Sequence, residues 1–340
     1  MPQKSLRIFE ACRPGTVTKR VSRCQTGVDM NNSNQFAAGE TRRNCTYPFG
    51  ALADPAAEPP DEELVSRAQT GEKDALEKLV RRHQAWVYNI AIRMLWHREV
   101  AEDATQEILI KVVTKLSTFR GQSQFRTWLY RIAVNHLLNV RKSAAEEQVT
   151  TFTDMGRSLD ETPDLDLPDT KSVPVDLPVL VEEARVGCMT GMLLCLDRRQ
   201  RLAFILGEVF GVASEFGAEV MDVSPDNFRQ LLSRARRDLY QFMNDKCGLV
   251  NAANPCRCKK KTRAFMQAGY VDPHNLQFAA DRLARVSSVA PHRLDELQSL
   301  DRQHAELFRD HAFLAPSDLA TKLRELVIRS GVAADVDSVH

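Results

Sequence analysis

The stretch FRTWLYRIAVNHLLNVRKS, residues 125–143, reads as one helix that mixes aromatic, basic and amide side chains. Its apolar positions, among them Phe125, Leu129 and Ala133, recur at helical spacing and predict one buried face. The remaining face offers arginines and an asparagine, which suit a phosphate backbone and unstacked bases. For a lone helix, the alternative is that Trp128 and Tyr130 are core or half-exposed residues and that the arginines form a solvated face, so other evidence is required.

The whole chain has 340 residues, of which 43% are hydrophobic and 27% are charged, so it is long enough for two to three globular domains. No run approaches the roughly 18 apolar residues of a membrane span, and the N-terminus has no signal-peptide core. We therefore expect a cytoplasmic protein. The eight cysteines are spread along the chain, which favours metal or redox chemistry over a disulfide framework.

Apolar positions at helical spacing, with no strand pattern, predict an all-α fold. Two small helical domains are expected, joined by an acidic linker and followed by a helical extension. Met30 is an alternative start of the chain. The expected organisation is a disordered tail (1–60), a first helical domain (61–145), an acidic Pro-containing linker (146–187), a second helical domain (188–244), and a Cys-containing basic loop with a helical extension (245–340).

The first domain has a positive surface. From Leu64 to Lys142 the chain has 14 Lys or Arg against seven Asp or Glu. The segment FRGQSQ, residues 119–124, is a small-residue loop beside the aromatic helix, where an unstacked base can be accepted by stacking and hydrogen bonds. These features predict single-stranded DNA as a ligand. His136 falls in the apolar stripe, where we expect a core histidine with a satisfied hydrogen bond.

The segment EDATQEILIKVVTKL, residues 102–116, predicts a second functional face. Its apolar stripe leaves four side chains on the opposite side of the helix: Asp103, Gln106, Glu107 and Ile110. An acidic surface with an apolar centre suits a basic partner helix.

Residues 199–243 have the order of a helix-turn-helix. A short helix is expected at 214–221, then a turn at Asp222, and a third helix with Ser224 as N-cap and Pro225 at its first position. The outward positions of this third helix are suited to DNA, because Arg and Gln can bind bases bidentately. Those positions are Asp226, Asn227, Arg229, Gln230, Ser233, Arg234, Arg236 and Arg237.

Together, DATQEILIKVV, FRGQSQFRTWLYRIAVNHLLNVRKS and LDRRQRLAFILGEVFGVASEFGAEVMDVSPDNFRQLLSRARRDL resemble regions 2 and 4 of the extracytoplasmic-function (ECF) sigma factors of the sigma-70 family. The resemblance implies a bacterial transcription initiation factor without enzymatic activity. Its partners would be core RNA polymerase (β′ clamp helices and β flap), promoter DNA and an anti-sigma factor, with no membrane. Gly217 and Asp222 depart from the family pattern, which has a bulky apolar residue and a turn glycine there.

The resemblance also assigns roles to residues. Polymerase binding falls to Asp103, Gln106, Glu107 and Ile110. Capture and melting of the minus-10 element fall to the loop from Arg120 to Gln124 and to Arg120, Gln122, Arg126, Trp128, Arg131, Asn135, Arg141 and Lys142. Recognition of the minus-35 duplex falls to Ser224, Asp226, Asn227, Arg229, Gln230, Ser233, Arg234 and Arg236.

The segment CGLVNAANPCRCKKKTR, residues 247–263, places three thiols in a basic loop: Cys247, Cys256 and Cys258. With His274 as a fourth ligand they can form a zinc site or another metal site, although no cofactor is required for the sigma function. A redox thiol switch and a structural or DNA-contacting loop are the alternatives. Cys188 and Cys195 are expected in a helix core, and three further helical stretches are expected after residue 275.

Two other functions remain open at this point. One is a helix-turn-helix regulator that does not depend on core polymerase, which needs the second domain but not the acidic face. The other is a metal or thiol sensor that acts by protein contacts. The helical extension is expected to regulate the protein.

Overall fold

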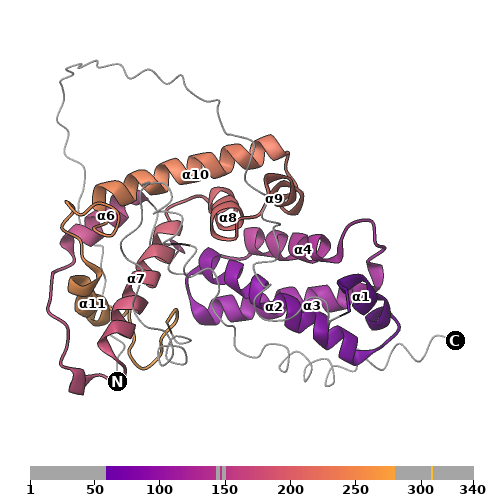
Figure 1. The fold of residues 1–340 in the computed structure, drawn as a ribbon, viewed down its shortest axis with the longest axis horizontal. Coiled ribbons are helices and arrows are strands. Elements are labelled where there is room, and N and C mark those ends of the chain that lie inside the picture. Colours follow the sequence, from indigo (N-terminus) through magenta and orange to yellow (C-terminus); the bar gives the residue numbers. More distant parts are fainter. Residues whose placement is uncertain (1–58, 143–145, 148–150, 280–307, 309–340) are drawn as a thin grey trace, which may run out of the picture. The chain divides into compact units, whose positions relative to one another are not determined.

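The computed structural model describes residues 59–142, 146–147, 151–279 and 308, all within one compact unit of the chain, Cys45–His340. These residues form helices, turns and one isolated bridge, and contain no strand (Figure 1). The predicted all-α fold is confirmed for this part of the chain. Apart from residues 59–60, the predicted disordered tail (1–60) lies outside the described residues.

The first domain consists of α1 (Asp61–Gln69), α2 (Lys73–Leu95), α3 (Arg98–Lys115) with the short 3-10 helix η1 (Leu116–Thr118), and α4 (Phe125–Asn139). Side chains such as Leu64, Ile90 and Ile108 are fully buried between them. Trp96 ends α2 in the left-handed conformation, with φ 64°. Its indole Nε1 donates to the carbonyl oxygen of Gly187 at 2.9 Å, so the end of α2 is tied to a later helix.

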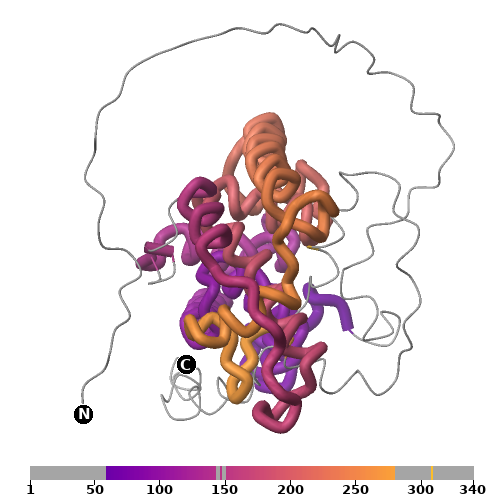
Figure 2. The backbone as a smooth tube through the Cα atoms, turned by 90° about the vertical axis from the view of Figure 1, so that its left-hand side faces the viewer, coloured from indigo at the N-terminus to yellow at the C-terminus, as the bar shows by residue number. Residues whose placement is uncertain are grey.

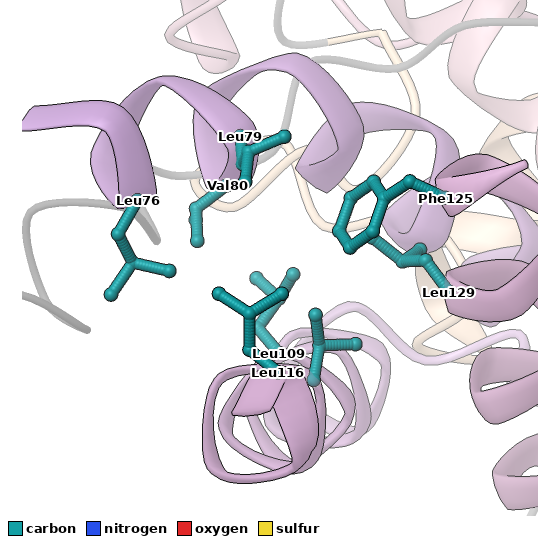
Figure 3. A pocket seen from close by; sticks show the side chains of 8 residues that line it. Leu76, Leu79, Val80, Leu109, Leu116, Phe125 and Leu129 are labelled. Carbon is teal, nitrogen blue, oxygen red and sulfur yellow. The ribbon is translucent and has the colours of Figure 1, made fainter. Parts of the chain in front are cut away.

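Eight apolar side chains of the first domain surround a cavity of about 10 Å³ between α2, α3 with η1, and α4 (Figure 3). They are Leu76, Leu79, Val80, Leu109, Val112, Leu116, Phe125 and Leu129. A space of this size holds at most one water molecule, and an apolar lining offers no hydrogen bond to it. The cavity is therefore a packing gap in the core and is too small for a ligand.

The linker is more ordered than the sequence predicted. It contains α6 (Phe152–Glu161), the 3-10 turn η2 (Thr170–Ser172) and the start of α7 (Leu177–Leu193). Prolines at 163 and 168 keep the segment between α6 and η2 extended, but Pro178 lies in the first turn of α7. That position needs no backbone N–H, so proline starts this helix rather than breaking it.

The second domain follows the predicted order. Helix α8 (Arg198–Phe204) continues as the π-helical turn η3 (Ile205–Val209), and then come α9 (Ser214–Met221) and α10 (Pro225–Lys246). The Asp197 side chain accepts hydrogen bonds from the backbone N–H groups of Arg199 and Gln200, and Ser224 caps α10 in the same way through Asn227. The predicted helix-turn-helix is present with its predicted cap.

The extension differs from the expected loop. Helix α11 (Cys258–Gln267) begins directly at Cys258 and packs on α7, and the two segments run side by side in Figure 2. The helix predicted from Leu276 is not present over residues 276–279, because backbone N–H groups there bond to a side chain of α7. The rest of that helix and the two later predicted helices lie outside the described residues, apart from Phe308.

Candidate functional site

The acidic face of α3 is present as predicted. Asp103, Glu107 and Ile110 are exposed, Gln106 is half-buried, and the opposite side of the helix is packed into the core. Ile110 is 38% exposed, which is unusual for a large apolar side chain in this structure. A partner that covers this face would bury the apolar Ile110 side chain, and the two carboxylates beside it would favour a basic partner.

The environment of the histidine behind this face, His136, disfavours its charged form. The ring of His136 is 7% exposed, and the Lys111 ammonium donates to its Nδ1 at 2.6 Å. Burial lowers the pKa of His136 and the charge of Lys111 lowers it further, whereas Glu107 acts in the opposite direction. The expected core histidine is therefore only partly satisfied, since its Nε2 has no hydrogen-bond partner.

Helix α4 presents part of the predicted strand-binding set. Asn135 is exposed and Arg126 and Arg131 are half-exposed. Trp128 is also half-buried, with its ring 5.3 Å from that of Phe119 and 5.7 Å from that of Phe125, so only the exposed part of the ring remains for a base. Tyr130, which the helical pattern put at an edge, is buried and stacks on Trp86 with ring centroids 3.5 Å apart.

The ends of α4 define the rest of this set. Arg120 and Gln122 are exposed in the loop before α4. Gly121 between them has φ 68°, a backbone conformation in which a residue with a side chain would be strained. The helix ends at Asn139, four residues before the predicted end. Arg141 and Lys142 are therefore exposed in the segment beyond the helix and not on its surface.

The outward face of α10 is the predicted one. All eight outward positions expected on this helix, from Asp226 to Arg237, are exposed. Arg229 lies 2.6 Å from Asp226 and 3.6 Å from Glu215, and Arg236 pairs with Glu208. Both arginines thus have carboxylate partners that a DNA phosphate or base would have to replace.

Gly217 and Asp222, the two residues that depart from the family pattern, both fit the geometry of the second domain. A side chain at Gly217 would put its Cβ 2.4 Å from Cζ of Phe228, so the phenyl ring of α10 fills the space that a bulky residue on α9 would occupy. Asp222 adopts the left-handed conformation with φ 53°, one of the residue types that tolerate it. The turn between α9 and α10 is intact.

The predicted metal ligands are not assembled. The backbones of Cys247 and Cys256 pair as an isolated parallel β-bridge, and their thiols are free. Cys258 starts α11, but His274 is exposed in a turn. Within the described ranges, no three His, Cys, Asp or Glu side chains are grouped so that they could hold a metal ion. A metal at these thiols stays a prediction.

No pattern in the sequence predicts that Cys188 of α7 lies near these thiols. Burial raises the pKa of Cys188, and the nearby thiols of Cys258, Cys247 and Cys256 raise it further. Burial likewise raises the pKa of Cys258 to about 12. Both shifts favour the protonated thiol, which is a weak nucleophile. A thiol switch at this loop stays a prediction.

A buried ion cluster around Arg201 was also missed. The guanidinium of Arg201 is 2% exposed and donates to the carbonyl oxygens of Met94 at 2.5 Å and Leu193 at 2.9 Å, and to Glu146 at 3.1 Å. Arg198 donates to Glu146 at 2.7 and 2.8 Å and to three carbonyl oxygens at the end of α4. The Arg201 cluster, defined as Arg198, Arg201 and Glu146, connects α8 to the first domain.

The extension is held by a second missed contact. The buried carboxylate of Glu183 on α7 accepts backbone hydrogen bonds from Gln277, Phe278 and Ala279 at 2.7 to 2.9 Å. Arg98 at the start of α3 donates to the carbonyl oxygen of Leu276 at 3.2 Å. These residues are distant in sequence from one another, and hydrophobic periodicity gives no signal for such pairings.

A comparison with known protein families supports the resemblance predicted for the first domain. The family described as Sigma-70 region 2 matches residues 79–146, from the middle of α2 to Glu146. In the described part of the chain, no helix is long and apolar enough to cross a membrane.

Similar curated proteins match about half of this chain. The RNA polymerase sigma-H factor of Pseudomonas aeruginosa is 30% identical over 184 residues, which are 52% of this chain and 90% of that protein. The ECF RNA polymerase sigma-E factors of Haemophilus influenzae and Escherichia coli are each 32% identical over 184 residues, covering 52% of this chain and 91% and 90% of theirs.

Two solved structures are also similar. A structure of CnrH in complex with the cytosolic domain of CnrY has 21% identity and a TM-score of 0.40, covering 54% of this chain and 97% of that one. A structure of the sigma factor RpoE with the anti-sigma factor NepR from Bartonella quintana has 20% identity and a TM-score of 0.32. It covers 49% of this chain and 95% of that one. On the strength of the curated relatives, which it matches over nine-tenths of their length, the chain belongs to the ECF sigma factors of the sigma-70 family.

Proposed function

We propose that this sigma factor binds core RNA polymerase through the acidic face of α3, melts the minus-10 element with α4 and the loop before it, and binds the minus-35 duplex with α10. Transcription initiation itself follows from the family. The assignment of each step to residues is the proposal. The polymerase would supply the chemistry, so this chain needs no catalytic group.

The observation that carries the proposal is the exposed face of α3. Ile110 is exposed about one turn beyond Glu107 and two turns beyond Asp103, on a helix whose other side is buried. A basic partner that covers this face would gain charge attraction to the carboxylates together with burial of the Ile110 side chain. The proposed partner is the basic surface of the clamp helices of the β′ subunit.

The faces of α4 and α10 support the DNA steps. Arg126, Arg131 and Asn135 share an accessible side of α4 with the half-exposed ring of Trp128, which suits phosphate contact beside base stacking. On α10, Gln230 and Arg234 are exposed in its first turns, where a recognition helix meets base edges.

The test is binding of core RNA polymerase by the purified full chain at several salt concentrations. The variant Asp103→Lys with Glu107→Lys reverses the charge of the face, and we expect at least about a tenfold loss of affinity that is largest at low salt. The control is Glu62→Lys with Asp74→Lys, which makes the same charge change at exposed positions of α1 and α2.

Equal affinity of the charge-reversed variant and the wild-type chain would refute the docking face. Duplex DNA binding without polymerase binding would favour a helix-turn-helix regulator instead. The control variant guards against a general effect of net charge, because it should bind polymerase like the wild-type chain.

Regulation through the C-terminal extension is the last part of the proposal. The extension is attached at residues 276–279 by Glu183 and Arg98, close to the start of the polymerase-binding helix α3. Removing residues 280–340 leaves this attachment in place. A changed promoter output in a reconstituted transcription assay would support regulation, and an unchanged output would refute it.

A further inference from the structure

Helix α7 carries a buried carboxylate that neither polymerase binding nor DNA binding uses. Glu183 is 1% exposed and shares a face of α7 with the buried residues Leu180 and Ala184. Burial raises the pKa of Glu183, whereas hydrogen bonds from backbone N–H groups and the charge of Arg98 act in the opposite direction. A carboxylate in such surroundings is costly unless its oxygens are hydrogen-bonded. The groups that bond to Glu183 are therefore essential to this face of α7.

Those groups belong to a short segment of the extension, residues 276–279. One oxygen of Glu183 accepts from the N–H of Gln277 at 2.8 Å, and the other accepts from Phe278 at 2.9 Å and Ala279 at 2.7 Å. Hydrogen bonds to an ionised group are stronger than those between neutral groups, and successive N–H groups form a concave site for an anion. The carboxylate thus binds the main chain of the segment rather than one of its side chains.

Arg98, at the start of α3, binds the same segment. Its Nη1 donates to the carbonyl oxygen of Leu276 at 3.2 Å, and its backbone N–H donates to Oε1 of Gln277 at 3.3 Å. Polar groups of four successive residues are therefore paired with α7 or α3.

A single aromatic ring adds side-chain specificity to this contact. Phe278 is 5% exposed, and a Cβ placed on Gly187 would lie 3.3 Å from its Cε2, so a side chain at that position would press on the ring. The indole of Trp96 lies 6.2 Å from the phenyl centroid, and its Nε1 donates to the carbonyl oxygen of Gly187 at 2.9 Å. Main-chain hydrogen bonds combined with one buried aromatic anchor are characteristic of peptide-recognition sites.

We propose that Trp96, Arg98, Glu183 and Gly187 form a peptide-docking site, here called the Glu183 site, whose ligand in the free chain is the segment 276–279. The ligand class is a peptide with one aromatic side chain and successive free backbone N–H groups around it. The segment belongs to the same chain, so its effective concentration is of the order of millimolar and it fills the site. A partner protein with the same chemistry has to displace it. This binding function does not depend on the roles proposed for α3, α4 and α10.

The experiment uses the full chain with Phe278→Pro, which removes the ring and one of the three N–H donors and so empties the site. A fluorescent peptide of residues 270–282, YVDPHNLQFAADR, is titrated into this chain, and its anisotropy reports binding. Phe278→Ala, which keeps all three N–H groups, is a milder second variant. The matched control is Asn275→Ala, because Asn275 is exposed directly before the segment.

We expect the peptide to bind the Phe278→Pro chain at least about tenfold more tightly than the wild-type chain, whose site is filled by its own segment. The Asn275→Ala chain should behave like the wild type. A peptide that itself carries Phe278→Ala should bind the Phe278→Pro chain at least about tenfold more weakly, because it lacks the anchor. Adding Glu183→Gln to the Phe278→Pro chain should weaken peptide binding by a similar factor, because the amide loses the charge-assisted bonds.

Absence of peptide binding by both Phe278 variants would overturn the docking site. Equal binding by the wild-type chain, or by the peptide without the ring, would place the peptide elsewhere and would overturn it as well. Loss of the helical circular dichroism signal in both variants would show that residues 276–279 are part of the fold and not a ligand, which also contradicts the proposal. None of these measurements involves polymerase or DNA, so failure of the docking face on α3 leaves the result intact.

Discussion

Two sets of ion pairs hold the described part of the chain together, and they differ in their access to water. The Arg201 cluster is buried, with Glu146 and Arg201 side chains 3% and 2% exposed. The linker and extension are joined by Lys246 with Asp160, Lys260 with Asp166, and Lys261 with Asp164, at 2.5 to 3.0 Å. In these pairs at least one partner is largely exposed.

The difference teaches that distance alone does not rank these contacts. Water and salt screen an exposed pair, and holding two long side chains in place costs entropy that offsets the attraction. A buried pair is screened little, but each charge depends on its partner, because an unpaired buried charge is costly. The two sets should therefore respond differently to substitution, acid and salt.

The largest effect is expected for Glu146→Ala. The substitution leaves the buried guanidinium of Arg201 without its carboxylate, and we expect the free energy of unfolding to fall by about 3 kcal/mol. That figure is at the lower end for a broken buried pair because the side chain of Arg198, 16% exposed, can regain water. Urea unfolding followed by circular dichroism measures it.

The matched comparison is Asp166→Ala, which removes the carboxylate of an exposed linker pair. Its unfolding midpoint should equal that of the wild-type chain within error. If Glu146→Ala and Asp166→Ala lose similar stability, burial does not make the Arg201 cluster more important for stability than the exposed linker pairs.

A second, smaller effect is expected for Arg198→Ala. This side chain donates to the carbonyl oxygens of Leu137, Leu138 and Val140 as well as to Glu146, but it is partly exposed. We expect a loss of about 1.5 kcal/mol in unfolding free energy, the lower end for bonds to a charged group. Arg199→Ala, at the exposed neighbouring position, should leave stability unchanged, and a loss there would point to helix propensity instead.

Acid should weaken the buried cluster selectively. Burial alone would raise the pKa of Glu146, but the hydrogen bonds and charges of Arg198 and Arg201 outweigh it and lower the pKa below the usual 4.5. A lowered pKa in the folded state means that the stabilisation is present above about pH 4.5 and is lost as the pH falls through the folded value. The stability difference between wild type and Glu146→Gln should therefore shrink between pH 6 and pH 3, and a constant difference would contradict this.

The smallest effect is expected for the linker pairs. Asp160→Asn with Asp166→Asn removes two exposed carboxylates that face Lys246 and Lys260. We expect a slightly lower unfolding midpoint at low salt and no difference from wild type at high salt, because added ions screen the pairs. A deficit that persists at high salt would show that these pairs are better shielded than their exposure indicates.

Much of the second domain could be read from the sequence because its signals are local. Ser224 followed by Pro225 predicted the start of α10, and the apolar spacing before it predicted α9 at its observed bounds. The exposed side of α3 followed from periodicity in the same way. Local rules also misled, since Pro178 falls in the segment predicted as a Pro-containing linker, yet it lies in the first turn of α7.

The long-range contacts that join the domains, the linker and the extension could not be predicted from local sequence signals. Arg201 and Glu146 are 55 positions apart, and Glu183 finds its backbone partners 94 to 96 positions later. Such pairings depend on how the helices pack and not on a repeating pattern along the chain. The same reason explains why Cys188 was assigned to a helix core without its neighbouring thiols.

The close approach of Phe228 to Gly217 has a practical consequence for chimeras. Because the ring of α10 occupies the space over the glycine of α9, a recognition helix taken from a relative would meet an empty site or a clash unless its own α9 came with it. Promoter specificity in this protein should therefore be exchangeable only as the block from Ser214 to Lys246, and not as α10 alone.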